Sequence, residues 1–279
     1  MKKLILTITT GILLAACSSS VEDDLMTPGI PDEIMIEVDV DRPVSRAGYT
    51  NANLDKINLI IHNGVNPDYS YTASCSKIGM SWMTDKKMVW DPARSAVSVA
   101  AFAPARNVGS LSTIDVNVPA FYADANDVKN ADFLLMTAEI DPKSDLTGDN
   151  KLQLTLSHTL SKLCIDFGDM VVSGVKVDGT VLTGKCNLRH ENAAVEVTDN
   201  SSVSISPFKT DEGLYECMII PQTAGKFSVS FRAGGRKYRW TSDKPVIFEP
   251  NTTYTLPLQA TTSGSAKGIM EKGSRSQTY

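Results

Sequence analysis

The chain has 279 residues, of which 42% are hydrophobic, 7% aromatic and 21% charged. This composition excludes a disordered or collagen-like chain and is sufficient for at least one full hydrophobic core. The formal net charge of −5 removes the electrostatic basis for binding a polyanionic backbone. We therefore expect no nucleic-acid partner.

The N-terminus has the features of a bacterial export signal. Two lysines follow the initiator methionine, and residues 4–14 form an apolar run. This run is too short for a transmembrane helix, which needs about 20 residues. It ends in Leu-Ala-Ala-Cys at residues 14–17, which resembles a lipobox. We predict a lipoprotein signal peptide at residues 1–16, cleavage between Ala16 and Cys17, and lipidation of Cys17; an ordinary signal peptide with an incidental cysteine is the alternative.

Beyond the signal, the sequence predicts a polar tether and then β-strands. Residues 17–32 are the tether, because three serines and an acidic run follow the lipobox. Apolar residues then alternate with polar ones, as is typical of strands with one buried face. The alternation recurs at residues 57–61, and residues 97–101 are expected to be a strand because their valines are β-branched. The first strand has its apolar side chains at Ile34, Ile36, Val38 and Val40.

Two β-hairpins are predicted from turns that contain glycine. An Asp-Gly turn is expected to join residues 175–177 to residues 180–182. A Gly-Gly turn is expected to join residues 227–231 to the strand that follows. In the second hairpin, large apolar side chains would meet on one face: Phe231 with Tyr238, and Val229 with Trp240.

The apolar phase slips by one residue within residues 152–167, so this segment must bulge or pass from one packing environment to another. A polar, turn-forming segment at residues 141–150 precedes it, and we place a domain boundary there. The predicted fold class is all-β, with two β-sandwich domains at residues 33–148 and 149–260. Residues 261–279 are expected to form a flexible tail, because they contain few large apolar groups.

Five segments follow the lipobox in order and carry a family resemblance. They read VWD leading into VSVAAFAP, then ADFLLM, LTLSHTLSKL, IIPQ and YTL. Together they resemble landmarks of the fimbrillin family, the lipoprotein pilins of gut and oral Bacteroidia. The resemblance implies two transthyretin-like domains, a surface-exposed precursor held in outer-membrane lipid by acylated Cys17, and assembly with other subunits into fimbriae that contribute to adhesion. The adhesion ligand is left open.

The resemblance also implies activation by proteolysis. In these pilins an Arg-specific protease removes the first strand, and the matching step here lies between Arg46 and Ala47. Loss of strand 34–40 would open an apolar groove that a strand of another subunit fills; a solvated linker arginine is the alternative. Residues 261–279 lack the alternation of a donor strand. Either the segment at residues 254–258 is the donor, or the chain accepts a strand without donating one, as a tip or accessory subunit would. An anchor subunit would instead keep its first strand and its lipid.

No catalytic motif is evident, so we expect no enzymatic activity, no metal and no cofactor. His158 lies in the core phase of its strand and is expected to be structural. The acidic segment around Asp145 lacks the spacing of a calcium loop. The rival function is a non-polymerising surface lipoprotein that binds glycan through exposed Trp82 or Trp90. For the tryptophans themselves, packing in the core is the preferred interpretation.

The cysteines that follow the lipobox leave two interpretations open. Four thiols in an exported protein could pair in three ways. We favour burial as small free hydrophobes, because two of them lie within apolar runs. The four residues are Cys75, Cys164, Cys186 and Cys217.

Overall fold

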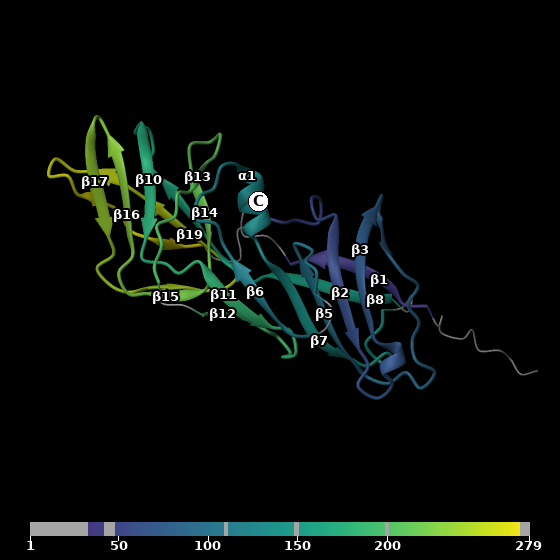
Figure 1. Ribbon diagram of the computed structural model, residues 1–279. Helices are drawn as coiled ribbons and strands as arrows, with labels where there is room; N and C mark the ends of the chain where they lie inside the picture. Colours follow the sequence, from purple (N-terminus) through teal and green to yellow (C-terminus); the bar gives the residue numbers. More distant parts are fainter. Residues whose placement is uncertain (1–32, 42–47, 109–110, 148–150, 199–200, 274–279) are drawn as a thin grey trace, which may run out of the picture. The chain divides into compact units, whose positions relative to one another are not determined.

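The computed structural model describes residues 33–41, 48–108, 111–147, 151–198 and 201–273 (Figure 1). Within them the chain is built almost entirely of β-strands, and the predicted all-β class is confirmed. One α-helix, α1 (Ala125–Ala131), and one 3-10 turn, η1 (Pro67–Tyr69), interrupt the strands in this part of the chain. The side chain of Asp124 caps α1 by accepting hydrogen bonds from the second and third amides of the helix.

The largest sheet has seven strands in the order β1-β8-β7-β5-β2-β3-β4. Its two edge strands, β1 and β4, also contact one another, so the sheet curves around its own core. The strands predicted near the N-terminus, at residues 57–61 and at residues 97–101 are confirmed. The bounds are β1 (Met35–Val40), β2 (Lys56–His62), β3 (Tyr71–Ile78), β4 (Ser81–Thr84), β5 (Val97–Ala103), β7 (Leu134–Ile140) and β8 (Lys151–His158).

The inner face of this sheet encloses a core of buried aliphatic side chains from β1, β2, β5 and β8. Strand β5 is buried on both faces, because Ala100 and Phe102 belong to a second core that continues into the C-terminal half. A strand covered on both sides has no solvent face to carry polar residues. This explains why residues 99–103 of β5 are continuously apolar instead of alternating.

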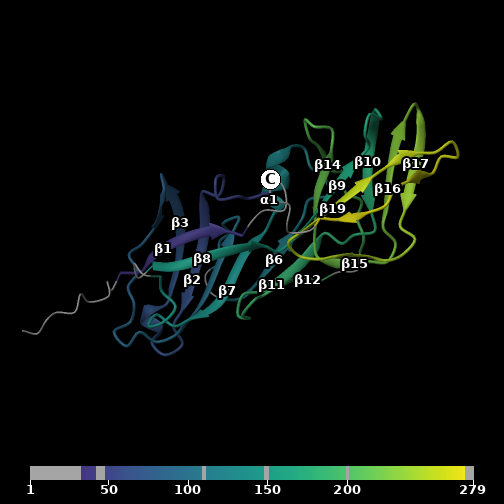
Figure 2. The ribbon, with the colours of Figure 1, turned by 180° about the vertical axis from the view of Figure 1, so that it is seen from behind.

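Smaller sheets surround the second core, and all of their strands except β6 come from the C-terminal half (Figure 2). A five-stranded sheet has the order β13-β14-β9-β19-β22, with bounds β13 (Phe208–Lys209), β14 (Tyr215–Ile219), β9 (Ser161–Asp166), β19 (Thr252–Pro257) and β22 (Glu271–Lys272). Two three-stranded sheets are β10 (Val172–Asp178), β16 (Ser228–Ala233) and β17 (Arg236–Thr241), and β12 (Val195–Val197), β11 (Thr183–Asn187) and β6 (Thr113–Asn117). The two-stranded pairs are β15 (Gln222–Ala224) with β18 (Val246–Phe248), and β20 (Gln259–Ala260) with β21 (Ala266–Lys267).

One predicted hairpin is confirmed and the other is wrong. Strands β16 and β17 pair in the expected register across the Gly-Gly turn, with Phe231 opposite Tyr238. The Asp-Gly turn does not return the chain onto β10, which pairs instead with β16. Gly179 is still required, because its φ is +99° and a Cβ there would lie 1.9 Å from the carbonyl oxygen of Lys226. The Asp-Gly pair therefore does form a turn, but the strand that pairs with β10 is the apolar strand β16.

The phase slip marks a change of sheet. β8 ends at His158 in the seven-stranded sheet, and β9 begins at Ser161 in the five-stranded sheet. The leucines of β8 lie in the first core, whereas Leu163 and Ile165 lie in the second. The change of packing environment is therefore confirmed. The strand pairing puts the change of sheet at Thr159 and Leu160. The division into two domains at residue 148 stays a prediction, as does the transthyretin-like form of the domains.

The end of the described chain has two short strands within the predicted tail, whose flexibility stays a prediction. β21 and β22 lie after residue 260 and pair with β20 and β19. The indole Nε1–H of Trp240 donates to the carbonyl of Gly268 at 3.0 Å. Backbone pairing and one buried indole attach this segment although it has few apolar residues.

Candidate strand-exchange site

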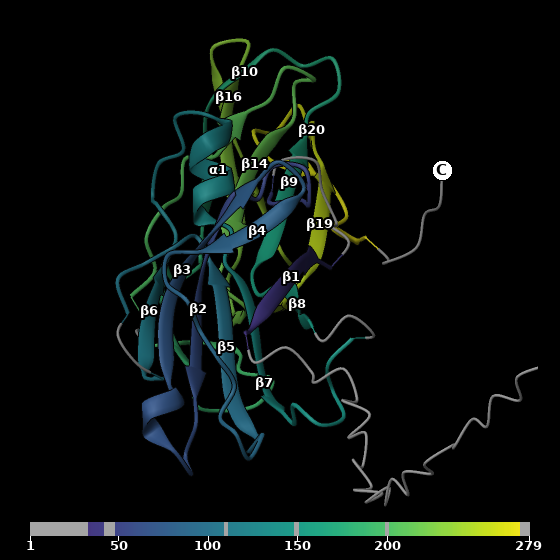
Figure 3. The same ribbon diagram turned by 90° about the vertical axis from the view of Figure 1, so that its right-hand side faces the viewer.

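The first strand fills a groove at the edge of the seven-stranded sheet. β1 runs parallel to β8 and beside it, as Figures 1 and 3 show, with Ile36 opposite Leu152 and Val38 opposite Leu154. Its inward side chains are 5–8% exposed, whereas Met35 on the outward face is 50% exposed. The strictly alternating sequence causes this division, because successive strand residues point to opposite faces. The inward side chains are the predicted Ile34, Ile36, Val38 and Val40.

Strand β8 depends on β1 for most of its sheet pairing. β1 pairs with Lys151 to Leu156, and β7 pairs with β8 only through Leu134 and Leu135 near its other end. If β1 left, this part of β8 would present unpaired backbone groups above an apolar floor. Such an edge is a template for an added strand.

Polar contacts hold the two ends of β1. At its start, the amide of Ile34 donates to the carbonyl of Met88 at 2.9 Å. At its end, the amide of Val40 donates to Asn51 Oδ1 at 2.6 Å, and the amide of Asp41 donates to the carbonyl of Leu156 at 2.8 Å. These are ordinary hydrogen bonds that another strand could replace.

The chain is fixed again immediately after the gap in the described residues. The amide of Tyr49 donates to Asp132 Oδ2 at 3.0 Å, and Asn53 Nδ2 donates to the carbonyl of Gly48 at 3.1 Å. A Cβ on residue 48 would lie 2.6 Å from Asp132 Oδ2, so only glycine allows this approach. Tyr49 is itself buried, and burial together with the nearby Asp132 carboxylate raises the pKa of its phenol. Lys129 lies over the Tyr49 ring, 5.0 Å from its centroid.

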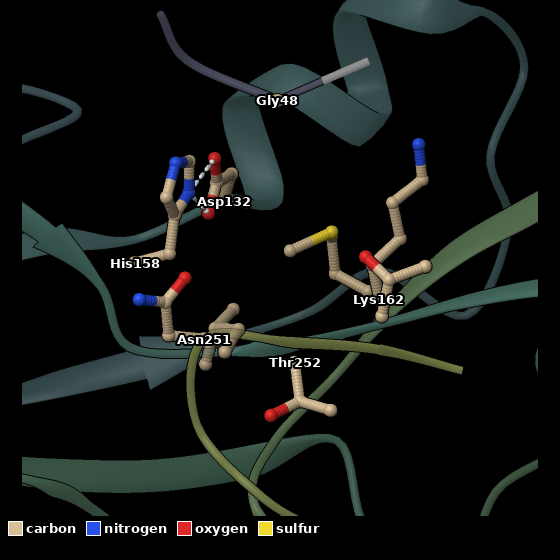
Figure 4. A pocket seen from close by; sticks show the side chains of 9 residues that line it. Gly48, Asp132, His158, Lys162, Asn251 and Thr252 are labelled. Atoms are coloured by element: carbon tan, nitrogen blue, oxygen red, sulfur yellow. Dashed lines mark hydrogen bonds and ion pairs between the residues drawn. The ribbon is translucent and has the colours of Figure 1, made fainter. Parts of the chain in front are cut away.

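A buried Asp–His pair provides this attachment point (Figure 4). Asp132 follows the C-terminus of α1 and is 0% exposed; His158 ends β8 and is 9% exposed. His158 Nδ1 lies 2.8 Å from Asp132 Oδ2. The pairing of Leu134 with His158 brings the two residues together. His158 therefore has a structural partner, as expected, but the sequence did not identify Asp132 or Gly48 as its neighbours.

A second buried charge pair lies near the first. Lys162 Nζ on β9 is 2.7 Å from Glu216 Oε2 on β14, and both side chains are less than 10% exposed. Lys162 and Asn251 border a cavity of about 20 Å³, large enough for one water molecule. The cavity is lined by Gly48, Asp132, His158, Leu160, Lys162, Met218, Asn251, Thr252 and Thr253. The sequence signal for this pair is the lysine itself, because Lys162 lies within an apolar strand.

The structure does not test every predicted site residue. Ala16, Cys17, Arg46 and Ala47 lie outside the described residues, so lipidation and both cleavages stay predictions. Within the described chain, no group of three or more His, Cys, Asp or Glu side chains could hold a metal ion. No helix among those residues is long and apolar enough to cross a membrane.

The remaining candidates are part of the core. All four described cysteines are free and buried, and burial raises the pKa of Cys75 and Cys164 to about 12 and that of Cys186 to about 11. Trp90 and Trp240 are less than 10% exposed, which leaves half-buried Trp82 as the most accessible tryptophan. A platform of exposed tryptophans for sugar stacking is therefore absent from the described residues.

The fold and the site define an all-β protein whose first strand fills an apolar groove at a sheet edge. Sequence comparison identifies the family more narrowly: the fimbrillin-like family matches residues 46–271, and the chain belongs to it. The matched region leaves β1 outside. No curated protein matches the chain in sequence.

Solved structures share the fold at low sequence identity. A candidate cell adhesion protein from Bacteroides ovatus has a TM-score of 0.63 at 16% identity, covering 87% of this chain and 96% of its own. A candidate cell adhesion protein from Bacteroides uniformis has a TM-score of 0.61 at 14% identity, covering 87% and 98%. A fimbrial protein from Bacteroides ovatus has a TM-score of 0.53 at 13% identity, and the match covers 84% of this chain but 49% of that longer one.

Proposed function

We propose that this chain is a structural subunit of cell-surface fimbriae that is assembled by exchange of its first strand. Membership of the fimbrillin-like family supports the fimbrial role. The observation that carries strand exchange is β1 itself, an edge strand with its aliphatic side chains in the groove and a complete parallel ladder to β8. A strand from another subunit with the same alternation would satisfy both the apolar groove and the unpaired backbone.

Proteolysis between Arg46 and Ala47 is the proposed trigger. The step lies between β1 and the attachment of Gly48 and Tyr49 to Asp132. A cut there would separate β1 from the rest of the chain while the body remained held from residue 48 onward. Arg46 thus lies where a cut would release the first strand. This position favours a cleavage site over the alternative of a solvated linker arginine.

The precursor would be exported as a lipoprotein anchored in the outer membrane through acylated Cys17. Its place in the fimbrium is proposed to be that of a tip, accessory or stalk subunit. Pairing of β22 with the chain's own β19 favours a subunit that accepts a strand without donating its C-terminal end. An anchor subunit is the variant of this proposal in which both lipid and β1 are retained.

Limited proteolysis tests the proposal. The chain from Ser18 onward is purified and incubated with an Arg-specific protease, with the variant Arg46→Ala as control. We expect a cut after Arg46 in the parent only. The cut parent should then form heat-stable oligomers when a subunit that donates a strand is added. Intact monomer in the parent, or equal oligomers in the R46A control, would contradict protease-triggered strand exchange.

A further inference from the structure

One sheet around the second core has a basic outer face. Its strands β10, β16 and β17 are neighbours, as Figure 2 shows, and Val177, Val229 and Trp240 on its inner face are buried. Successive strand residues point to opposite faces, so the residues between the inward ones point outward. The exposed outward cations, which together we name the basic face, are Lys176, Arg232, Lys237 and Arg239.

The strand pairing brings these cations into two adjacent rows. Arg232 lies directly opposite Lys237 in the register of β16 with β17. Two residues further along the strands, Ser230 lies between Arg239 on β17 and Lys176 on β10. Directly opposite residues are about 5 Å apart at Cβ, and residues two positions apart on one strand are about 7 Å apart. The four cations therefore form one continuous patch.

Asp178 is the one carboxylate among the outward residues of these three strands. Its Oδ2 accepts from Arg239 Nη2 at 2.6 Å, and its Oδ1 accepts from the hydroxyl of Ser204. The side chain of Arg239 remains 58% exposed in this ion pair. Asp178 thus orients one of the four cations and leaves the other three without a carboxylate on the sheet.

The remaining positive charges are uncompensated in the part of the chain that the structure describes. Lys176 donates to the hydroxyl of Ser206, which carries no charge. Arg232 and Lys237 form no ion pair with a described residue. Like charges directly opposite each other on neighbouring strands are destabilising. The Arg232–Lys237 arrangement therefore costs the fold stability, and a bound anion would offset this cost.

Hydroxyl groups occupy the other outward positions of the sheet, and no large apolar side chain lies among them. Protein interfaces are enriched in aromatic residues and methionine and depleted in lysine, so this face does not resemble one. Hydroxyls interspersed with cations instead match a ligand that carries both hydroxyls and anionic groups. The outward hydroxyl residues on the three strands are Ser173, Ser228, Ser230 and Thr241.

The basic face is a local exception in an acidic chain. The formal net charge is −5, so the rest of the protein repels a long polyanion, whereas a short anionic segment is attracted here. The planar guanidinium of Arg232 suits an acidic group with two oxygens, such as sulfate or carboxylate. A glycan that carries such groups also supplies hydroxyls for the serines. A DNA backbone supplies phosphates but no comparable set of hydroxyls.

We propose that the basic face binds an anionic glycan. Sulfate or carboxylate groups of the glycan pair with Lys176, Arg232 and Lys237, and its hydroxyls bind Ser230 and the neighbouring serines. The inference goes beyond the proposed function, because it concerns what the subunit binds and requires neither cleavage nor strand exchange. β1 belongs to a different sheet, so the face is the same before and after its removal.

Calorimetric titration with a heparin decasaccharide as the probe tests the proposal. The protein is the chain from Ser18 onward with β1 in place. The variant carries Arg232→Gln and Lys237→Gln. The matched control carries Lys86→Gln and Lys143→Gln, which change the net charge equally at exposed positions of the N-terminal half. A short DNA duplex of similar charge is the competing polyanion, and urea unfolding monitors the fold.

We expect the parent to bind the decasaccharide, and a rise in NaCl from about 50 to about 150 mM should weaken binding about 10-fold. The variant without Arg232 and Lys237 should bind about 10-fold more weakly or worse, whereas the control should stay within about 2-fold of the parent. The urea midpoint of the variant should be unchanged or higher, because the like-charge pair is gone.

Several outcomes would overturn the inference. They are an absence of binding at about 50 mM NaCl, an equal loss of binding in the control, and a DNA duplex that binds as tightly as the decasaccharide. A lower urea midpoint in the variant would show that these charges serve the fold and would overturn it as well. Failure of the Arg46 cut or of oligomer formation would instead contradict the proposed function and leave the glycan result standing.

Discussion

The two ends of the described chain both add an edge strand to a sheet, but only the N-terminal strand buries side chains in a core. β1 pairs with six consecutive residues of β8 and buries its inward side chains in the first core. β22 pairs with β19 through only two residues, Glu271 and Lys272, and both are exposed. A further backbone bond joins the Gly273 amide to the Thr253 carbonyl at 2.8 Å. The N-terminal strand completes a core, whereas the C-terminal strand lies on its surface.

This difference separates a strand whose loss must be compensated from one whose loss is tolerated. Burying each aliphatic side chain of β1 contributes about 1.5–3 kcal/mol, so the groove would not stay empty in water. β22 offers mainly backbone hydrogen bonds, each of which contributes about 0.5–1.5 kcal/mol net. The proposed strand exchange is therefore assigned to the N-terminal edge.

The most damaging expected change places a charge in the groove. Val38→Asp would bury an unpaired carboxylate opposite Leu154 and lower the free energy of unfolding by about 3–5 kcal/mol. Met35→Asp places the same group on the exposed face of the strand and should change stability by about 0.5 kcal/mol or less. Urea unfolding of both variants checks this; equal effects would contradict the burial of β1.

The floor of the groove gives the next largest effect. Leu154→Ala on β8 removes a side chain that is 0% exposed and should cost about 2–4 kcal/mol. Thr155→Ala, on the exposed face of the same strand, should cost far less. The comparison is made by thermal and urea unfolding, and a small effect of Leu154→Ala would show that the first core does not depend on β8.

The attachment point at residue 48 should give an intermediate effect. Gly48→Ala forces a Cβ to within 2.6 Å of Asp132 Oδ2, and we expect a loss of about 1–3 kcal/mol. The Tyr49 amide should exchange with solvent faster in this variant because its bond to Asp132 is strained. Hydrogen exchange measured by mass spectrometry reports this, and unchanged protection of residues 48–54 would contradict the close approach.

The C-terminal edge should give the smallest effect. Lys272→Ala removes the ion pair between Lys272 Nζ and Glu249 Oε2, which are 2.5 Å apart. Both side chains are half-exposed, so we expect the free energy of unfolding to change by about 0.5 kcal/mol or less. Urea unfolding is again the measurement. A loss comparable to that of Leu154→Ala would abolish the distinction between the two edges.

Local patterns in the sequence predicted local structure well. Alternation located β1, and the Gly-Gly turn gave the register of β16 and β17, because both depend on residues close in the chain. The Asp-Gly hairpin failed because the apolar strand β16, distant in sequence, pairs better with β10.

The site depended on contacts that no local pattern reveals. β1 and β8 are far apart in the chain, and so are Asp132 and His158, which meet only because β7 and β8 pair at that end. The approach of Gly48 to Asp132 likewise requires the folded chain. The sequence could predict that the first strand is amphipathic, but not which strand it covers or what holds the residues that follow it.

The central claim is that β1 is removed and another strand takes its place. The most direct test is mass spectrometry of the N-terminus of the protein taken from assembled fimbriae on the cell surface. The proposed mechanism predicts a mature chain that begins at Ala47. A chain that begins at acylated Cys17 and still carries β1 in the assembled fibre would contradict it.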